Sequence, residues 1–454
     1  MLASRRTLHF GVLPFTGTGH LNPMIALAQE LKSRGHRVTF FEKPKIEERV
    51  RQAGLEFVAL RSENLSPLKS PPDRDSGMWT EILTLRFNVE RVVRDIKHYL
   101  QQTPVALKEA GVDVLLINEI ALTGPTVAQT LGLPYFLIST SVPHHLGWSG
   151  SSWFTGHRSS ISFISWLESY LLELSALRVR GPVRRALDAY RHSLGFGSVR
   201  TIRKDYPFLA HISQLPRCLD FECKLRSPDF LHTGPWISPA ARPHVDFPWD
   251  HLDGRPLVYA TLGTTRNIQP QLFRMIAEAC STLGVQLLIS LGKRFDPASF
   301  ADLPGRPIVT RFAPQLELLK LAQIVISHGG PNTTFEALME GKPLVVIPLA
   351  YDQPAIAKRL AKLQLAVVLP VQRISALRIR RALVKILHEP QYRDAAELLQ
   401  QRLRLVDGAS RAVDTIANEL DKYSALEHKS SIGRVEVSRN AGPANSTGAS
   451  VLHS

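Results

Sequence analysis

Cysteine is scarce in this chain, and no apolar run is long. Three cysteines, Cys218, Cys223 and Cys280, occur among 454 residues and lack the spacing of metal ligands. An odd number cannot pair completely, so the sequence predicts thiols in a reducing compartment, the cytoplasm. No window holds about 18 uninterrupted apolar residues, the length that spans a bilayer, so no transmembrane helix is expected.

Acidic residues are outnumbered by basic ones, 40 to 55, which gives a net charge of +15. This excess favours an anionic partner, which can be nucleic acid, a membrane surface or a substrate. Nucleic acid is the weakest of these, because no basic run is interleaved with aromatic residues. A signal peptide is not expected at residues 7–16, because Pro14 interrupts the apolar run and an amphipathic helix pattern follows.

The chain is too long for one hydrophobic core, and two or three domains are expected. Apolar runs typical of buried parallel strands alternate with helix patterns in both halves, which predicts an α/β fold. Residues 234–256 are rich in proline and lack periodicity, as linkers do. We expect domains at 1–235 and 257–407, a linker at 236–256, a last helix at 408–423 and a disordered tail at 424–454.

The most informative stretch is residues 321–356. It has the pattern of a buried strand, a glycine turn, a helix beginning at Pro331 and a second buried strand. Pro331 suits the first helical position, because the N–H that proline lacks has no partner there anyway. In a right-handed strand–helix–strand unit, the free N–H groups of the helix start lie at the carboxyl ends of the strands. Phosphate is the ligand that fits this position best.

Polar side chains suited to a nucleotide sugar accompany this unit. Three can donate hydrogen bonds to phosphate, one can accept them from ribose one helical turn further on, and two can hold sugar hydroxyls. These are, in the same order, His328, Asn332 and Thr333, then Glu336, then Asp352 and Gln353. Any one of them alone is more often an ordinary cap or turn residue. The ordered set favours a nucleotide-sugar site.

Together these residues resemble the nucleotide-sugar signature of the UDP-glycosyltransferase family, whose members have the GT-B fold. The matching pieces are FAPQ at 312–315, HGGPNTTFE at 328–336, GKP at 341–343 and DQ at 352–353. Many members have Asn where this chain has Ile356, and the aliphatic residue resembles the bacterial carotenoid branch, near the macrolide glucosyltransferases. The resemblance implies two Rossmann-like doubly wound domains that face a central cleft, with the last helix returning to the first domain.

The resemblance also implies a role for each matched residue of the donor site. Uracil would stack on one aromatic ring and be held by a neighbouring amide. Later residues of the signature would bind the diphosphate, the ribose and the hexose. The residues are Phe312 and Gln315 for uracil, Thr264, His328, Gly330, Asn332 and Thr333 for the diphosphate, Glu336 for ribose, and Asp352 and Gln353 for the hexose.

The first domain opens with a strand pattern and a Gly-His loop. A dinucleotide site is weakly supported, because Asn22 replaces the third glycine of that fingerprint. The resemblance instead implies that His20 is the catalytic base, although a histidine that caps the next helix would look the same. Glu119 is the nearest match to the acid that usually orients this base. Asn118 can be the aligned residue instead, and a surface acid at a strand end is the ordinary alternative for Glu119.

Residues 141–206 are rich in aromatic and basic side chains and correspond to the variable acceptor pocket of the family. Trp148 and Trp153 favour a bulky, lipophilic acceptor that carries a hydroxyl. The apolar and Arg-rich segment 148–192 suggests reversible contact with an anionic membrane surface from the cytoplasmic side. A segment that packs wholly inside the protein is the competing interpretation.

The resemblance implies an inverting hexosyltransferase. It would move a hexose, with glucose as the default, from a UDP-sugar to a hydroxyl of the acceptor. No cofactor and no metal ion are expected, because the helix N-terminus can stabilise the leaving diphosphate. A UDP-sugar 2-epimerase of the same fold and a non-catalytic sugar-nucleotide-binding protein remain alternatives, and an NAD-dependent enzyme is remote.

Overall fold

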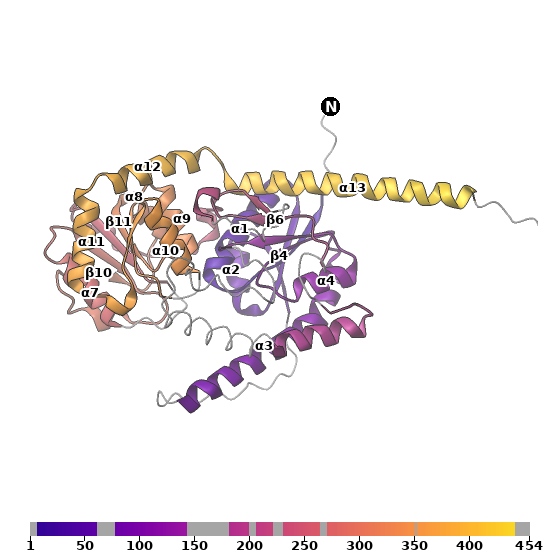
Figure 1. Ribbon diagram of the computed structural model, residues 1–454, viewed down its shortest axis with the longest axis horizontal. Helices are drawn as coiled ribbons and strands as arrows, with labels where there is room; N and C mark the ends of the chain where they lie inside the picture. Colours follow the sequence, from indigo (N-terminus) through magenta and orange to yellow (C-terminus); the bar gives the residue numbers. More distant parts are fainter. Residues whose placement is uncertain are drawn as a thin grey trace, which may run out of the picture.

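The protein has two lobes, each built on a parallel β-sheet with helices on both faces (Figure 1). The strands of such sheets are buried on both faces, which explains their near-continuous apolar sequences. The computed structural model describes residues 7–60, 78–142, 181–198, 206–220, 230–263, 270–349 and 352–440, of which 78–89, 427 and 429–440 as backbone only.

The first sheet has seven strands in the order β3-β2-β1-β4-β5-β6-β7. The strands are β1 His9–Leu13, β2 Arg37–Glu42, β3 Glu56–Ala59, β4 Val114–Asn118, β5 Tyr135–Ser139, β6 His211–Ser213 and β7 Phe230–His232. The helices among them are α1 Thr18–Ser33, η1 Pro44–Ile46, α2 Glu47–Gln52, α3 Met78–Ala110, α4 Gly124–Leu131 and η2 Arg217–Leu219. The order reverses between β1 and β4, and ligands of α/β sheets bind at such a point.

Alternating side chains divide the core of the first domain into two layers. Leu116 of β4 belongs to the layer that packs against α1, whereas its neighbours Leu115 and Ile117 belong to the layer under α3 and α4. Successive residues of a strand point to opposite faces, which produces this division. The same alternation decides which polar residue at the end of β4 faces α1.

The second sheet has six strands in the order β10-β9-β8-β11-β12-β13 and reverses between β8 and β11. Its strands are β8 Leu257–Thr261, β9 Gln286–Ser290, β10 Ile308–Thr310, β11 Ala322–Ser327, β12 Leu344–Val346 and β13 Ala366–Val368. Its helices are α7 Pro270–Cys280, η5 Pro297–Phe300, α8 Gln315–Leu321, α9 Pro331–Met339, α10 Gln353–Lys362, η6 Val371–Arg373, α11 Ala376–His388 and α12 Gln391–Arg404. The segment between the sheets contains η3 Pro239–Ala241 and η4 Trp249–His251.

An apolar cluster joins the two domains. Val142, Leu215 and Leu219 of the first domain share it with Ile356 and Leu360 of α10. Ile356 is 2% exposed, and burying such a side chain contributes about 1.5–3 kcal/mol. The burial of Ile356 in this cluster suits an aliphatic residue at this position.

The last helix, α13 Gly408–Asn440, leaves the second domain and lies along the first (Figure 1). Its residues Ala412, Val413 and Ile416 join the core layer of α1. At Gly408 a Cβ atom would lie 2.6 Å from the carbonyl oxygen of Gly234, so the close approach requires glycine. The helix extends beyond residue 423, where a disordered tail was expected to begin, and the domain bounds themselves remain a prediction.

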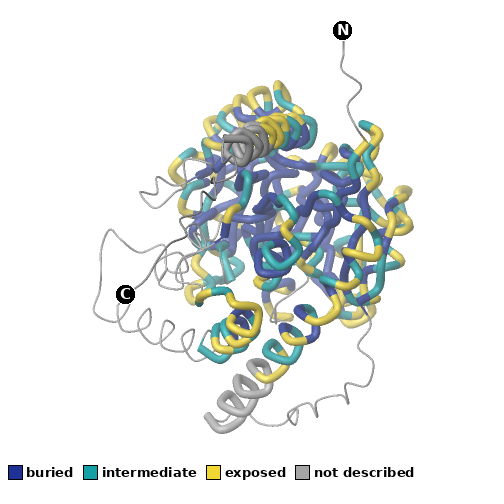
Figure 2. The backbone as a smooth tube through the Cα atoms, turned by 90° about the vertical axis from the view of Figure 1, so that its right-hand side faces the viewer, coloured by how far each residue is buried: buried dark blue, intermediate teal, exposed yellow. Residues whose placement is uncertain are grey.

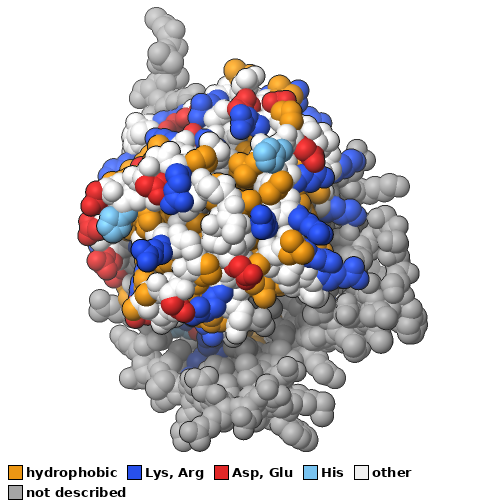
Figure 3. All heavy atoms as spheres, turned by 90° about the vertical axis from the view of Figure 1, so that its left-hand side faces the viewer, with side chains coloured by type: hydrophobic (Ala, Val, Ile, Leu, Met, Phe, Trp, Pro, Cys, Tyr) orange, Lys and Arg blue, Asp and Glu red, His pale blue; other side chains and the backbone are white. Residues whose placement is uncertain are grey.

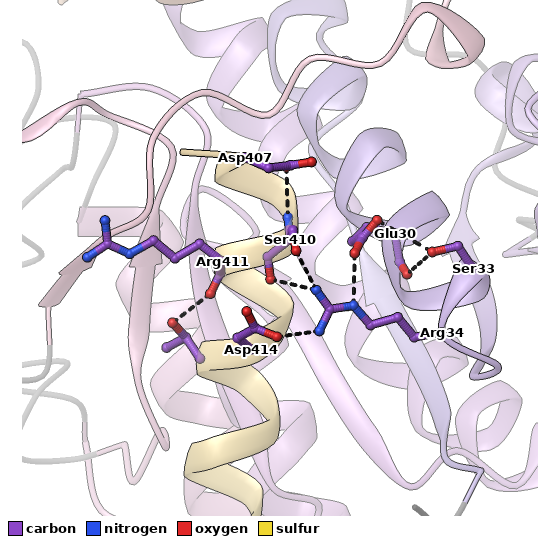
Figure 4. A network of polar contacts seen from close by, with 8 residues as sticks. Glu30, Ser33, Arg34, Asp407, Ser410, Arg411 and Asp414 are labelled. Atoms are coloured by element: carbon purple, nitrogen blue, oxygen red, sulfur yellow. Dashed lines mark hydrogen bonds and ion pairs between the residues drawn. The ribbon is translucent and has the colours of Figure 1, made fainter. Parts of the chain in front are cut away.

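Arg34 at the end of α1 fastens α13 to the first domain (Figure 4). Its Nε donates to Glu30 at 2.8 Å, its Nη2 to the carbonyl and hydroxyl oxygens of Ser410 at 2.9 and 2.7 Å, and its Nη1 to Asp414 at 2.5 Å. One guanidinium thus bonds two helices that are distant in the sequence.

Buried residues fill the centre of the molecule, and exposed residues lie towards its outside (Figure 2). On the outer face of the second domain, Lys and Arg are interspersed with acidic and apolar side chains (Figure 3). Within the described ranges, no helix combines the length and the apolarity that crossing a membrane requires. Cys218 and Cys280 are free thiols, as predicted, and Cys223 lies outside these ranges.

We expect the substitution Arg34→Ala to lower the unfolding free energy of the first domain by about 1–2 kcal/mol, because charge-assisted bonds to both helices are lost. The melting temperature should fall by about 2–8 °C. Arg274→Ala removes an exposed pair with Asp302 and serves as the control. Equal melting temperatures of both variants in differential scanning calorimetry would contradict the role of Arg34.

Candidate active site

The turn after β11 opens the N-terminus of α9 toward the first domain. Gly330 is the N-cap, Pro331 is the first helical residue, and the first turn has no acidic side chain. Gly329 has a φ of +80°, and a Cβ atom there would lie 2.9 Å from Val346. The free N–H groups and the positive end of the helix dipole can therefore accept an anion at this position.

His328 packs between two glycine turns. A Cβ atom on Gly263 would lie 2.8 Å from Nε2 of His328, and one on Gly330 would lie closer still. Burial lowers the pKa of His328 to about 4, so the ring is neutral at pH 7 and offers an N–H rather than a charge. Its Nδ1 is buried without a partner in the described part of the chain, and the contact of His328 with a phosphate remains a prediction.

Asn332 and Thr333 lie half-buried in the first turn of α9. The side chain of Asn332 crosses to the first domain, where Nδ2 donates to the carbonyl of Gly19 and Oδ1 accepts from Gln214 at 2.9 Å. Its NH₂ group has a second hydrogen for a phosphate oxygen. Asn332 thus contacts the first domain from the predicted diphosphate position.

Glu336 is buried one turn below, at 2% exposure. Its Oε2 accepts from Gln315 Nε2 at 2.5 Å, and its Oε1 pairs with Arg242 of the linker. Tyr259 in turn donates to Gln315 Oε1 at 3.0 Å. A carboxylate has about four lone-pair sites, so Glu336 retains acceptor capacity for a ribose hydroxyl.

The other predicted donor residues lie before α8 and at the start of α10. Phe312 precedes α8 and is 38% exposed, so its ring presents a face on which a base can stack. Asp352 is the N-cap residue of α10 and half-buried. Gln353 is buried, and its Oε1 accepts from the backbone N–H of Leu349 at 2.8 Å, which closes the loop that follows β12.

In the first domain, His20 lies in the first turn of α1 and is half-buried. Its Nδ1 is 2.7 Å from Thr140 Oγ1, and that oxygen accepts from Asn118 Nδ2 at 3.0 Å. With the proton on Nδ1 donated to Thr140, Nε2 has the lone pair that a base needs. Phe15 meets the His20 ring edge-on at 5.1 Å and is 41% exposed.

Glu119, the predicted partner of His20, lies on the other side of the sheet. Its carboxylate is 3.3 Å from Nε2 of His211, and that nitrogen is 2.6 Å from Ser139 Oγ. The N–H of Glu119 still bonds the carbonyl of Ile138 as in the strand, so residues 118 and 119 point to opposite faces. The described contacts favour Asn118, which reaches His20 through Thr140, and the partner of His20 remains a prediction.

Three predicted residues lie outside the described residues: Thr264 of the donor site and Trp148 and Trp153 of the acceptor pocket. Their roles remain predictions. The described residues contain no group of three or more His, Cys, Asp or Glu side chains that can hold a metal ion. An Asp-x-Asp tripeptide, the kind of motif that can hold one, occurs once, at Asp73 to Asp75, and also lies outside them.

Several site residues were not found from the sequence. Thr140, Gln214, Tyr259 and Arg242 carry no motif, and they lie far along the chain from their partners, for example 94 residues for Arg242 and Glu336 and 120 for Thr140 and His20. Only their positions could have indicated a role in the site, because Thr140 and Gln214 directly follow the ends of β5 and β6. Side chains at the carboxyl edge of a parallel sheet line its ligand site.

The points at which the strand order reverses in the two sheets thus face each other with complementary groups. The first domain supplies a histidine whose Nδ1 is bonded, and the second supplies a helix N-terminus, a neutral histidine and a buried carboxylate. This is the arrangement of a GT-B glycosyltransferase, and solved glycosyltransferases share the fold. The glycotransferase of kitacinnamycin aligns with a TM-score of 0.71 at 24% identity, over 91% of this chain and 99% of that one. VinC, solved with DTDP, aligns at 0.65 with 18% identity over 91% and 100%.

The sequence also matches the family described as UDP-glucoronosyl and UDP-glucosyl transferase over residues 73–403. The chain belongs to this family and is a glycosyltransferase that uses a nucleotide-sugar donor. The uncharacterized UDP-glucosyltransferase YojK of Bacillus subtilis is 25% identical over 410 residues, covering 89% of this chain and 96% of that protein. Zeaxanthin glucosyltransferase of Pantoea ananas is 25% identical, covering 90% and 95%.

The low pKa of His328 makes the stability of the second domain depend on pH. In the unfolded chain a histidine binds a proton near pH 6.5, whereas folded His328 does so only near pH 4. The contribution of the neutral ring is complete above pH 6.5 and is lost as the pH falls toward 4. The stability difference between wild type and His328→Gln should therefore shrink by about 1–2 kcal/mol from pH 7 to pH 5. Urea unfolding at both pH values measures it, and a constant difference would contradict the burial argument.

Proposed function

We propose that this glycosyltransferase moves a hexose, with glucose as the default, from a UDP-sugar to a hydroxyl of a lipophilic small molecule, with inversion at the anomeric carbon. The observation that carries the proposal is the contact between the His20 loop and the first turn of α9. It supports an arrangement in which the proposed base and the proposed diphosphate-binding helix end lie close together. An acceptor hydroxyl and a sugar bound between them meet both groups.

In the proposed reaction, Nε2 of His20 takes the proton of the acceptor hydroxyl while that oxygen attacks the anomeric carbon. The bond from this carbon to the diphosphate oxygen breaks on the opposite face, and the electron pair leaves with the nucleoside diphosphate. Thr140 fixes the tautomer of His20 by accepting from Nδ1. The helix dipole and the backbone N–H groups at the start of α9 stabilise the charge on the leaving diphosphate.

The donor assignments follow the family signature. The ring of Phe312 supports stacking of the base, and Gln315, fixed by Tyr259 and Glu336, supports its recognition. Glu336 is the proposed ribose acceptor, and Asp352 and Gln353 are the proposed contacts of the hexose. UDP is the proposed nucleotide by the family name. Thymidine diphosphate is the alternative, because VinC was solved in complex with DTDP.

The acceptor is proposed to be lipophilic and hydroxylated, as a xanthophyll is. The name of zeaxanthin glucosyltransferase and that of the oleandomycin glycosyltransferase of Streptomyces antibioticus, a 23% identical relative, support an apolar small molecule. Phe15 beside His20 adds an exposed apolar ring to the same side. The proposed contact with an anionic membrane rests on segment 148–192, of which the structure describes only 181–192. Co-sedimentation with anionic vesicles across a salt series tests it.

We expect His20→Ala to lower transfer by about 10²- to 10⁴-fold, the loss typical for a removed general base. UDP binding should survive, because His20 belongs to the acceptor side. Product formation from UDP-glucose with carotenoid, macrolide, sterol and phenolic acceptors, followed by mass spectrometry, measures transfer, and calorimetry measures binding. Acceptor-dependent release of UDP separates a transferase from a 2-epimerase and from a non-catalytic binding protein.

Two further variants identify the partner of the base. Thr140→Val removes the oxygen at Nδ1 and should reduce kcat by about 10- to 100-fold through misorientation of the ring. Glu119→Gln changes the opposite face of the sheet and should leave a larger kcat than Thr140→Val does. The reverse order would restore Glu119 as the partner. Near-normal turnover of His20→Ala would end its assignment as the base.

We further expect transfer to proceed without a divalent metal ion, since α9 supplies the positive field at the diphosphate. Initial rates in excess EDTA should match those in Mg²⁺ to within about twofold, a difference worth less than about 0.5 kcal/mol of barrier. A complete loss in EDTA that Mg²⁺ or Mn²⁺ restores would show that the metal is required and would direct attention to Asp73 and Asp75.

A further inference from the structure

Gln214 follows β6 and is 1% exposed, at the boundary between the domains. Both hydrogens of its amide are used: Nε2 donates to the carbonyl of Thr140 at 2.6 Å and to Oδ1 of Asn332 at 2.9 Å. Its Oε1 accepts from the backbone N–H of Trp236 at 3.3 Å, at the start of the linker. These partners fix which atom of the amide is oxygen and which is nitrogen.

The contacts of Gln214 close a ring of hydrogen bonds. Thr140 bonds Nδ1 of His20 through its hydroxyl and Gln214 through its carbonyl. Asn332 continues from Gln214 and returns to the carbonyl of Gly19, the residue that precedes His20. The ring therefore crosses the domain boundary twice and includes both the proposed base and the first turn of α9.

The hydrogen-bonded ring also requires the backbone of Gly19 to approach α9 closely. A Cβ atom on Gly19 would lie 3.2 Å from Nδ2 of Asn332, tighter than most side-chain contacts. The loop of His20 thus lies directly against α9 at this point. Its position relative to the helix N–H groups is determined by these few bonds.

We propose that Gln214 is a positioning residue that sets the place of His20 relative to the diphosphate-binding end of α9. The inference rests on the proposed function, in which the base and the leaving group belong to different domains. The acceptor oxygen must approach the anomeric carbon opposite the diphosphate, and a displacement of about 1 Å can lower a rate 10²-fold. Gln214 acts through Thr140 and Asn332.

A buried amide with a merely structural role behaves differently. Its loss lowers stability and weakens nucleotide binding and turnover together, because the whole site is loosened. Loss of a positioning residue lowers kcat while nucleotide affinity persists, because the N–H groups of α9 belong to the second domain and Glu336 is held by Gln315 and Arg242.

Two variants test the proposal. Gln214→Met keeps the length of the side chain and removes every polar contact. Gln214→Glu keeps the acceptor for Trp236 but replaces both donors, so that oxygen faces the carbonyl of Thr140 and Oδ1 of Asn332. Ser213→Ala is the matched control: this neighbour is fully buried and loses only a local bond from the N–H of Leu215, at 3.1 Å, outside the ring.

For both Gln214 variants we expect kcat to fall about 10- to 100-fold, with the Kd of UDP changed by less than about threefold, which is below about 1 kcal/mol. Ser213→Ala should retain kcat. Unchanged kcat in a folded Gln214 variant overturns the proposal. So does a loss of UDP affinity as large as the loss of kcat, because that result assigns Gln214 a structural role.

A second measurement separates this proposal from the proposed function. Diethyl pyrocarbonate modifies neutral imidazole, and peptide mass spectrometry localises the product on His20. Without any substrate, Gln214→Met should raise the rate of His20 modification above that of wild type and Ser213→Ala. If wild type transfers no sugar, the proposed function fails, and the rate of His20 modification alone tests the role of Gln214. A faster modification in Gln214→Met supports the hydrogen-bonded ring, and an unchanged rate overturns it.

Discussion

The site depends on one contact, between the first turn of α9 and the loop that carries His20. Each half is built by its own parallel sheet, at the point where the strand order reverses. Neither half is sufficient for the proposed reaction, because one holds the proposed base and the other the proposed anion-binding helix end. The apolar cluster around Leu215 and Ile356 and the return of α13 to α1 hold the halves together. Hydrogen bonds through Gln214 and Asn332 then fix the position of one half relative to the other.

The described charges of the candidate site are a neutral histidine and a paired carboxylate. His328 is kept neutral by burial, and the buried carboxylate of Glu336 is paired with Arg242. Burying a carboxylate without such donors is costly, so the linker arginine and Gln315 stabilise the residue proposed to meet ribose. In the first domain the hydroxyl of Thr140 bonds Nδ1 of His20 and thereby orients the ring.

Much of the donor site could be predicted from the sequence because its residues are local. The strand, the glycine turn, Pro331 and the polar residues of α9 follow within one strand–helix unit, whose geometry is nearly the same wherever it occurs. The partner of His20 could not be settled in this way. Asn118 and Glu119 are adjacent in sequence, and a register shift of one residue exchanges the faces of a strand. The preference for Asn118 required knowing that α1 covers the face of Leu116.

The sequence by itself determined the α/β class, the family signature and the candidate residues of the donor site, since these depend on periodicity and short spacing. The tertiary structure decided which distant residues meet. Arg242 reaches Glu336 across 94 positions and Gln214 reaches Asn332 across 118. Such pairs exist only because two sheets are brought together along an interface, and no local pattern encodes the geometry of that interface.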